Sequence, residues 1–90
     1  MLYMVIEYFN VGAATEIYRR FRERGRQLPS GVEYVDSWVD FDYVRCFQLL
    51  RAADRGLLDV WMSAWSDLEH FDVIPVRTSS EAAADIADQS

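Results

Sequence analysis

The sequence predicts an α+β domain of the ferredoxin-like type, with the element order β-α-β-β-α-β. Four segments have the composition of strands, and two segments with helical spacing of apolar residues follow the first and the third of them. Two such units with right-handed crossovers give a four-stranded antiparallel sheet with both helices on one face. A chain of 90 residues is enough for one domain. We expect this domain to span residues 1–78 and residues 79–90 to form a short C-terminal helical turn or a flexible tail.

The first strand and the first helix lie at the start of the chain. Residues 2–9, LYMVIEYF, are β-branched or aromatic with one charge, which is typical of a central strand. The next segment, NVGAATEIYRRFRERGRQ, predicts a helix that Asn10 caps and that the Pro and Gly of LPSG end. The apolar stripe of this helix consists of Ile17, Tyr18 and Phe21.

The second and third strands are expected at Val32–Asp40 (VEYVDSWVD) and Val44–Arg51 (VRCFQLLR), joined by a turn at residues 41–43. A three-residue turn aligns Tyr34 with Leu50, Asp36 with Gln48 and Trp38 with Cys46, and successive partners alternate between the two faces of the sheet. In this register the helices cover Val35, Val39, Phe47 and Leu49. The face away from the helices carries Tyr34, Asp36, Trp38, Cys46 and Gln48, and Glu7 is expected to join it from the first strand.

The second helix is expected within residues 52–68, with Asp54 as its N-cap. Its core-facing stripe consists of Leu57, Leu58, Trp61, Trp65 and Leu68. Residues 69–78 predict the fourth strand, and Pro75 places it at an edge of the sheet, because proline cannot donate to a ladder. Thr78 and Glu81 have the spacing of a capping box for the C-terminal turn.

The charge of the chain is acidic, with a formal net value of −6 and arginine as the only strongly basic residue type. An acidic chain lacks the electrostatic signature of nucleic-acid binding, and the arginines between Arg19 and Arg26 are expected to form a solvated helix face. Cys46 is the only cysteine, so no internal disulfide can form. No segment has the pattern of a signal peptide or the roughly 20 apolar residues of a membrane span. We therefore expect a cytoplasmic protein without a membrane partner.

The sheet face away from the helices is expected to be covered by a second copy of the chain. Aromatic residues make up 14% of the sequence, more than a small two-layer core usually holds. A two-fold homodimer is the commonest way to bury such a face. The residues expected to line this interface, or a ligand cavity within it, are Glu7, Tyr34, Asp36, Trp38, Cys46 and Gln48.

Several blocks of the sequence resemble the DUF3303 family of small uncharacterised bacterial proteins over about residues 1–78. The blocks are MLYMVIEYF, YRRFRERGR, YVDSWVD, RCFQLL and WSDLEHFDVIPV, in this order. The resemblance implies a dimeric α/β barrel, akin in fold to the antibiotic-biosynthesis monooxygenase and stress-responsive barrel families. It implies no activity, because one fold hosts many functions.

The chemistry of the chain stays open between three hypotheses. The first is a homodimer that binds a small hydrophobic or aromatic ligand between its two sheets. The second is a cofactor-independent enzyme, similar to a monooxygenase or an isomerase, with Glu7 or Asp36 as a desolvated general base. The third is a purely structural dimer. No cofactor or metal is expected: Asp67, Glu69, His70 and Asp72 lack a recognised ligand spacing and are expected at a solvated strand start, and Cys46 is expected to be a packing residue.

Overall fold

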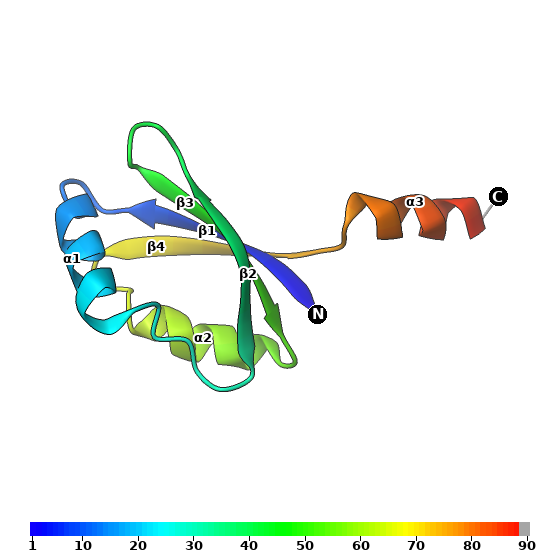
Figure 1. Cartoon of the computed structure of the whole chain (residues 1–90), viewed down its shortest axis with the longest axis horizontal. Coiled ribbons are helices and arrows are strands. Elements are labelled where there is room, and N and C mark those ends of the chain that lie inside the picture. The colour runs from blue at the N-terminus through cyan, green and yellow to red at the C-terminus, as the bar shows by residue number, and fades with distance from the viewer. Residues whose placement is uncertain (89–90) are drawn as a thin grey trace.

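The computed structural model describes residues 1–88 and has the predicted ferredoxin-like order with an additional C-terminal helix (Figure 1). The strands are β1 (Leu2–Phe9), β2 (Val32–Val39), β3 (Arg45–Ala52) and β4 (Glu69–Val76), and the helices are α1 (Ala14–Arg24), α2 (Arg55–Ser63) and α3 (Ser79–Asp88). The sheet is antiparallel with the order β2-β3-β1-β4. A helical turn or flexible tail was predicted for residues 79–90, and residues 89–90 of this segment lie outside the described residues.

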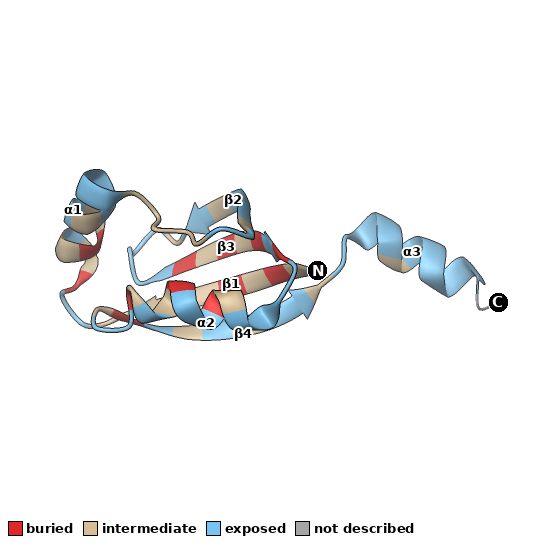
Figure 2. Cartoon of the chain, turned by 90° about the horizontal axis from the view of Figure 1, so that it is seen from below, coloured by how far each residue is buried: buried red, intermediate tan, exposed pale blue. Residues whose placement is uncertain are grey.

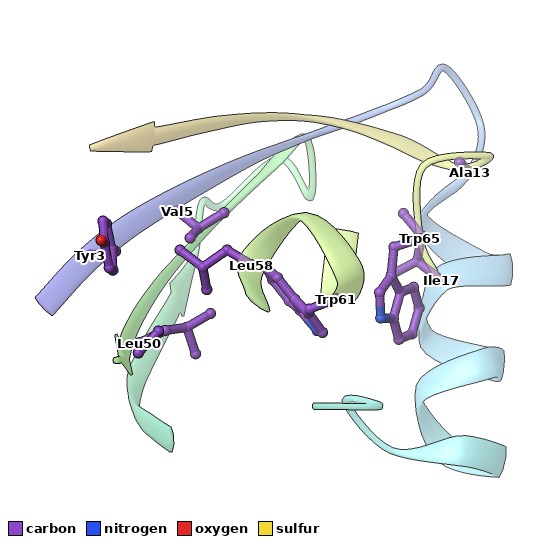
Figure 3. Packing of buried hydrophobic residues seen from close by; sticks show 9 residues of the cluster. Tyr3, Val5, Ala13, Ile17, Leu50, Leu58, Trp61 and Trp65 are labelled. Carbon is purple, nitrogen blue, oxygen red and sulfur yellow. The ribbon is translucent and has the colours of Figure 1, made fainter. Parts of the chain in front are cut away.

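The hydrophobic core lies between α2 and the centre of the sheet (Figure 3). Leu58 of α2 is fully buried beside Val5 of β1 and Leu50 of β3, and Trp61 is almost fully buried one turn further on. Burial of one such large apolar side chain contributes about 1.5–3 kcal/mol to stability. The predicted stripe of α2 is therefore the core stripe, although the helix ends at Ser63 and Trp65 lies in the turns that follow.

Helix α1 lies at the end of the molecule (Figure 1), where Ile17 joins the core and Arg20 binds the segment after α2. The Arg20 guanidinium makes two hydrogen bonds to the Asp67 carboxylate, at 2.9 and 2.8 Å, and a third to the backbone oxygen of Ala64 at 3.1 Å. The prediction that Asn10 caps α1 is wrong: the N-cap is Ala13, without a side-chain cap. Asn10 instead donates to the backbone oxygen of Asp67.

Three local predictions about the second half of the chain are confirmed. Asp54 caps α2 by accepting a hydrogen bond from the backbone N–H of Gly56. Strand β4, which contains Pro75, is an edge strand. Thr78 accepts from the N–H of Glu81 at the start of α3. This helix is exposed along most of its length and projects away from the sheet (Figure 2).

The two faces of the sheet are assigned differently from the prediction. A β-bulge between Tyr34 and Asp36 breaks the alternation of β2. The pairing of Tyr34 with Leu50 is confirmed, but after the bulge Ser37 pairs with Gln48, and the expected pairs of Asp36 with Gln48 and Trp38 with Cys46 do not form. The bulge therefore turns Ser37 toward the helices, and Asp36 and Trp38 toward the open face.

In the central strands β1 and β3, the side chains lie on the opposite faces to those predicted. Val5 and Leu50 are core residues beneath α2, so Glu7, Cys46 and Gln48, which alternate with the same parity, also face the helices. The open face carries Met4, Ile6, Tyr8, Asp36, Trp38, Phe47, Leu49 and Ile74. Apolar residues on both faces of β1 and β3 explain the error, because the alternation alone selects neither face for the core.

Candidate functional site

A cavity of about 210 Å³ lies beside the core, between α1, the sheet and the end of α2. Its walls are mainly aromatic and aliphatic, and polar side chains gather where β1, β3 and β4 run next to one another. The lining residues are Glu7, Phe9, Ile17, Tyr18, Phe21, Arg26, Ser37, Val39, Cys46, Gln48, Trp61, Trp65 and Glu69.

The polar wall contains a hydrogen-bonded series from Arg26 to Gln48 and from Gln48 to Glu7. The Arg26 Nε donates to the Gln48 Oε1 at 3.3 Å, and the Gln48 Nε2 donates to the Glu7 Oε2 at 2.6 Å. Gln48 and Glu7 are both buried, and Arg26 is half-buried. The series fixes the orientation of the Gln48 amide and supplies the Glu7 carboxyl with a donor, as a buried polar group requires.

Glu69 of β4 also belongs to this polar wall, but no side chain donates a hydrogen bond to its carboxyl group as Gln48 does to Glu7. The residue is 1% exposed, and neither of its carboxyl oxygens makes a hydrogen bond of normal geometry within residues 1–88. Burial, followed by the neighbouring Glu7 carboxyl, raises the pKa of Glu69 to about 10. At neutral pH these surroundings favour the protonated form of Glu69, whose carboxyl group lies beside that of Glu7 at the cavity wall.

Cys46 lies on the same wall but is not a reactive thiol. Burial raises its pKa above the ordinary value, and the charge of Glu7 raises it further. A thiolate is the nucleophilic form, and this environment disfavours it. The expectation that Cys46 is a packing residue agrees with its burial and its place in the cavity wall.

Arg26 lies at the rim of the cavity, just beyond the end of α1. The indole N–H groups of Trp61 and Trp65 both donate to its backbone oxygen, at 2.9 and 3.1 Å. Its guanidinium stacks 3.8 Å above the centre of the Tyr34 ring and also approaches Phe21. These contacts hold a cation beside the cavity, so the prediction of a solvated arginine face is wrong for Arg26, and also for Arg20, which binds Asp67.

The structure divides the predicted site residues into two groups. Glu7, Cys46 and Gln48 come together in the cavity beneath the helices, on the face opposite to the predicted one. Asp36 and Trp38 lie on the open face and take no part in this cavity. Tyr34 reaches the cavity rim indirectly: its hydroxyl is 2.7 Å from the Ser37 Oγ, and its ring lies beneath Arg26.

Glu69 and Arg26 are two important residues of the site that were not predicted. Glu69 was expected at a solvated strand start, but it is buried opposite Phe9, the last residue of β1. The sequence feature that could have identified Arg26 is the glycine before it. Gly25 has a φ of 67° and ends α1, so Arg26 does not belong to the helix face that carries the other arginines.

The fold and the cavity define a small ferredoxin-like α+β domain with an acid pair buried beneath its helices. The profile of the family described as a domain of unknown function, DUF3303, matches residues 1–90, and the chain belongs to this family. No curated protein and no solved structure matches the chain. Among residues 1–88, no helix is long and apolar enough to cross a membrane. The cytoplasmic location stays a prediction.

Proposed function

We propose that this protein binds a small, largely apolar molecule that carries a ring and one polar group, in the cavity beneath its helices. The observation that carries the proposal is Glu69, a buried acid at the cavity wall whose two oxygens lack partners in the described part of the chain. Buried polar groups are normally satisfied, and a ligand hydroxyl, carbonyl or amide would satisfy this one. Ligand sites typically combine an apolar wall with a few convergent polar groups.

The size and the shape of the cavity support a ligand of one or two rings. An engineered cavity of about 150 Å³ is large enough for benzene, and the present cavity is about 210 Å³. The rings of Tyr18 and Phe9 meet edge to face at 6.4 Å between their centres and form one aromatic side of the wall. The proposed site lies within one chain, whereas the sequence analysis predicted a ligand site between the sheets of two copies.

The test is binding of 1-naphthylamine, a neutral two-ring dye whose emission shifts to shorter wavelength in an apolar site. Titration of the parent protein is expected to show saturable binding. Cys46→Phe fills the cavity and should weaken binding at least tenfold, with Ser37→Leu at the rim as a second cavity variant. Leu49→Phe is the matched control, because this β3 residue points to the open face. No saturable binding, or an equal loss in Leu49→Phe, would contradict the proposal.

We further propose that two copies of the chain associate through their open sheet faces. Trp38 and Ile74 on this face are 50% and 44% exposed in the single chain. Each strand has eight residues, so the face covers roughly 500 Å² in projection, from about 4.8 Å between strands and about 3.3 Å per residue. Two copies would bury about 1,000 Å² together, where specific interfaces begin.

The oligomeric state tests this second proposal. Light scattering after gel filtration of the parent at micromolar concentration is expected to give the mass of a dimer. Trp38→Asp places a charge at an aromatic anchor and should give a folded monomer. Val60→Asp, at an exposed position of α2, is the control that should stay dimeric. A monomeric parent protein would contradict the proposal.

A further inference from the structure

We propose that Glu7 and Glu69 act together as base and acid in a proton-shift reaction on a small apolar carbonyl compound bound in the cavity. This inference rests on the proposed ligand site and assigns its chemistry. The observation that indicates a ligand is the state of Glu69, which is 1% exposed, lines the cavity and has two carboxyl oxygens without hydrogen-bond partners within residues 1–88.

The positions of the two acids follow from the β1–β4 ladder. Glu7 pairs with Phe71, and Phe9 pairs with Glu69, so the two glutamates are diagonal neighbours on the same face of adjacent strands. Diagonal neighbours lie about 7–8 Å apart at the backbone, within reach of long side chains. Both side chains line the same cavity, so one small molecule there can meet both carboxyl groups.

The surroundings of the two carboxyl groups give them different roles. The Glu7 carboxyl accepts a hydrogen bond from the Gln48 amide, whose other end is bound by the Arg26 guanidinium. Glu69 has no such donor and lies in an apolar environment, which favours the neutral acid. Pairs of titratable groups whose environments differ in this way are the usual basis of acid–base chemistry near neutral pH.

The proposed reaction moves a proton from the carbon next to a carbonyl group. The Glu7 carboxylate takes this proton, the C–H electron pair forms a C=C bond, and the carbonyl electron pair moves onto oxygen, which takes the Glu69 proton. The product of this step is an enol. In a β,γ-unsaturated ketone, Glu7 then returns its proton to the γ-carbon while the enol proton returns to Glu69. The net reaction is isomerisation to the conjugated ketone, and it consumes no other reagent.

The probe is β,γ-unsaturated cyclohexenone, whose conversion to the conjugated isomer is followed by ultraviolet absorbance. The parent protein is expected to accelerate this conversion over buffer. Glu7→Gln keeps the shape and the Gln48 contact but cannot take a proton, so it should lower kcat/KM by about 10²–10⁴-fold. Glu69→Gln can still donate an N–H but cannot give a proton, so it should lower kcat at least tenfold with little change in KM. Glu33→Gln, an exposed carboxylate on the open face, should match the parent.

Binding of the same ketone is measured in parallel by the fluorescence of Trp61 and Trp65, which line the cavity. If the ketone binds and the parent gives no acceleration, or if Glu7→Gln keeps the parent rate, the acid–base inference is overturned and the ligand site stands. If neither the ketone nor the dye binds, the ligand site itself is refuted, and the acid–base inference with it. Circular dichroism of each variant shows that the loss does not come from unfolding.

Discussion

Glu69 lies diagonally across the β1–β4 ladder from Glu7, beneath the helices and in the wall of one cavity. Two carboxyl groups placed this close in an apolar environment cannot both ionise without a large cost. The chain supports only one of them, through Gln48 and Arg26. Apolar residues of similar size at these positions would often be as stable or more stable, and for this reason we propose a chemical role for the pair.

The buried acid predicts an unusual dependence of stability on pH. The pKa of Glu69 rises from 4.5 to about 10 on folding, so between these values the folded chain holds a proton that the unfolded chain has released. Stability therefore falls as pH rises through this window. The titratable or charged groups around Glu69 or the cavity are Glu7, Cys46, Tyr18, Arg20, Arg26 and Asp67.

Urea unfolding at several pH values between 5 and 9 measures this effect. The parent should lose stability with rising pH relative to Glu69→Gln, in which position 69 no longer titrates. The comparison between the two proteins removes the contribution of the surrounding groups, which both share. A difference that does not change with pH would show that Glu69 is ionised in the folded chain.

The contact between Gln48 and Glu7 predicts coupled stability effects. Gln48→Leu removes the donor and leaves the buried Glu7 carboxyl without it, at a cost of about 1–3 kcal/mol in the free energy of unfolding. When Glu7→Leu is also present, Gln48→Leu should cost less by about 0.5–3 kcal/mol. A double-mutant cycle by urea unfolding checks this. The cycle of Gln48→Leu with Glu33→Leu, on the other face, is the control and should be additive.

The contacts of Arg20 predict that its removal lowers the stability of the protein more than the removal of Arg19, its neighbour on α1. Arg20 is 16% exposed and binds both Asp67 and the backbone of Ala64, so Arg20→Ala should cost about 1–3 kcal/mol. Arg19 makes only exposed pairs with Glu16 and Glu23 within its helix, so Arg19→Ala should lower the stability far less, because exposed ion pairs contribute little. Thermal unfolding of both variants measures the two losses of stability. Equal losses would show that Arg20 does not attach α1 to the domain.

The environment of Cys46 predicts a slow thiol. Burial and the nearby Glu7 carboxyl raise its pKa, so the native protein should react with a thiol reagent at pH 8 at least 100-fold more slowly than the same protein in urea. The native rate should not depend on reagent size if the cavity wall is closed around the sulfur. A native rate equal to that in urea would mean that Cys46 is exposed.

The fold could be predicted from sequence because each element carries its own local signal. Pro75 identified the edge strand, Asp54 the start of α2 and the Trp61–Trp65 spacing the core stripe, and each of these signals is independent of the rest of the chain. The family was predicted from short sequence blocks and is confirmed over the whole chain.

The site could be predicted only in part, for two physical reasons. Glu7, Cys46 and Gln48 were grouped correctly, but they were placed on the open face because polar residues are usually found away from the core. Their burial depends on Arg26 and on Glu69, which reach the cavity from distant parts of the chain. The bulge in β2 is a second reason, because one extra residue places Asp36 and Trp38 on the face opposite to Tyr34, and no glycine or proline in the strand indicates it.

The most direct test of the acid pair is carboxyl ¹³C NMR of the protein labelled at its glutamate side chains. We expect one glutamate signal to keep the chemical shift of a protonated acid at pH 7 and to be missing from the spectrum of Glu69→Gln. Glu33→Gln should leave that signal in place. If every glutamate signal of the folded protein has moved to the shift of a carboxylate by pH 7, Glu69 is not a neutral acid and the proposed acid–base pair does not exist.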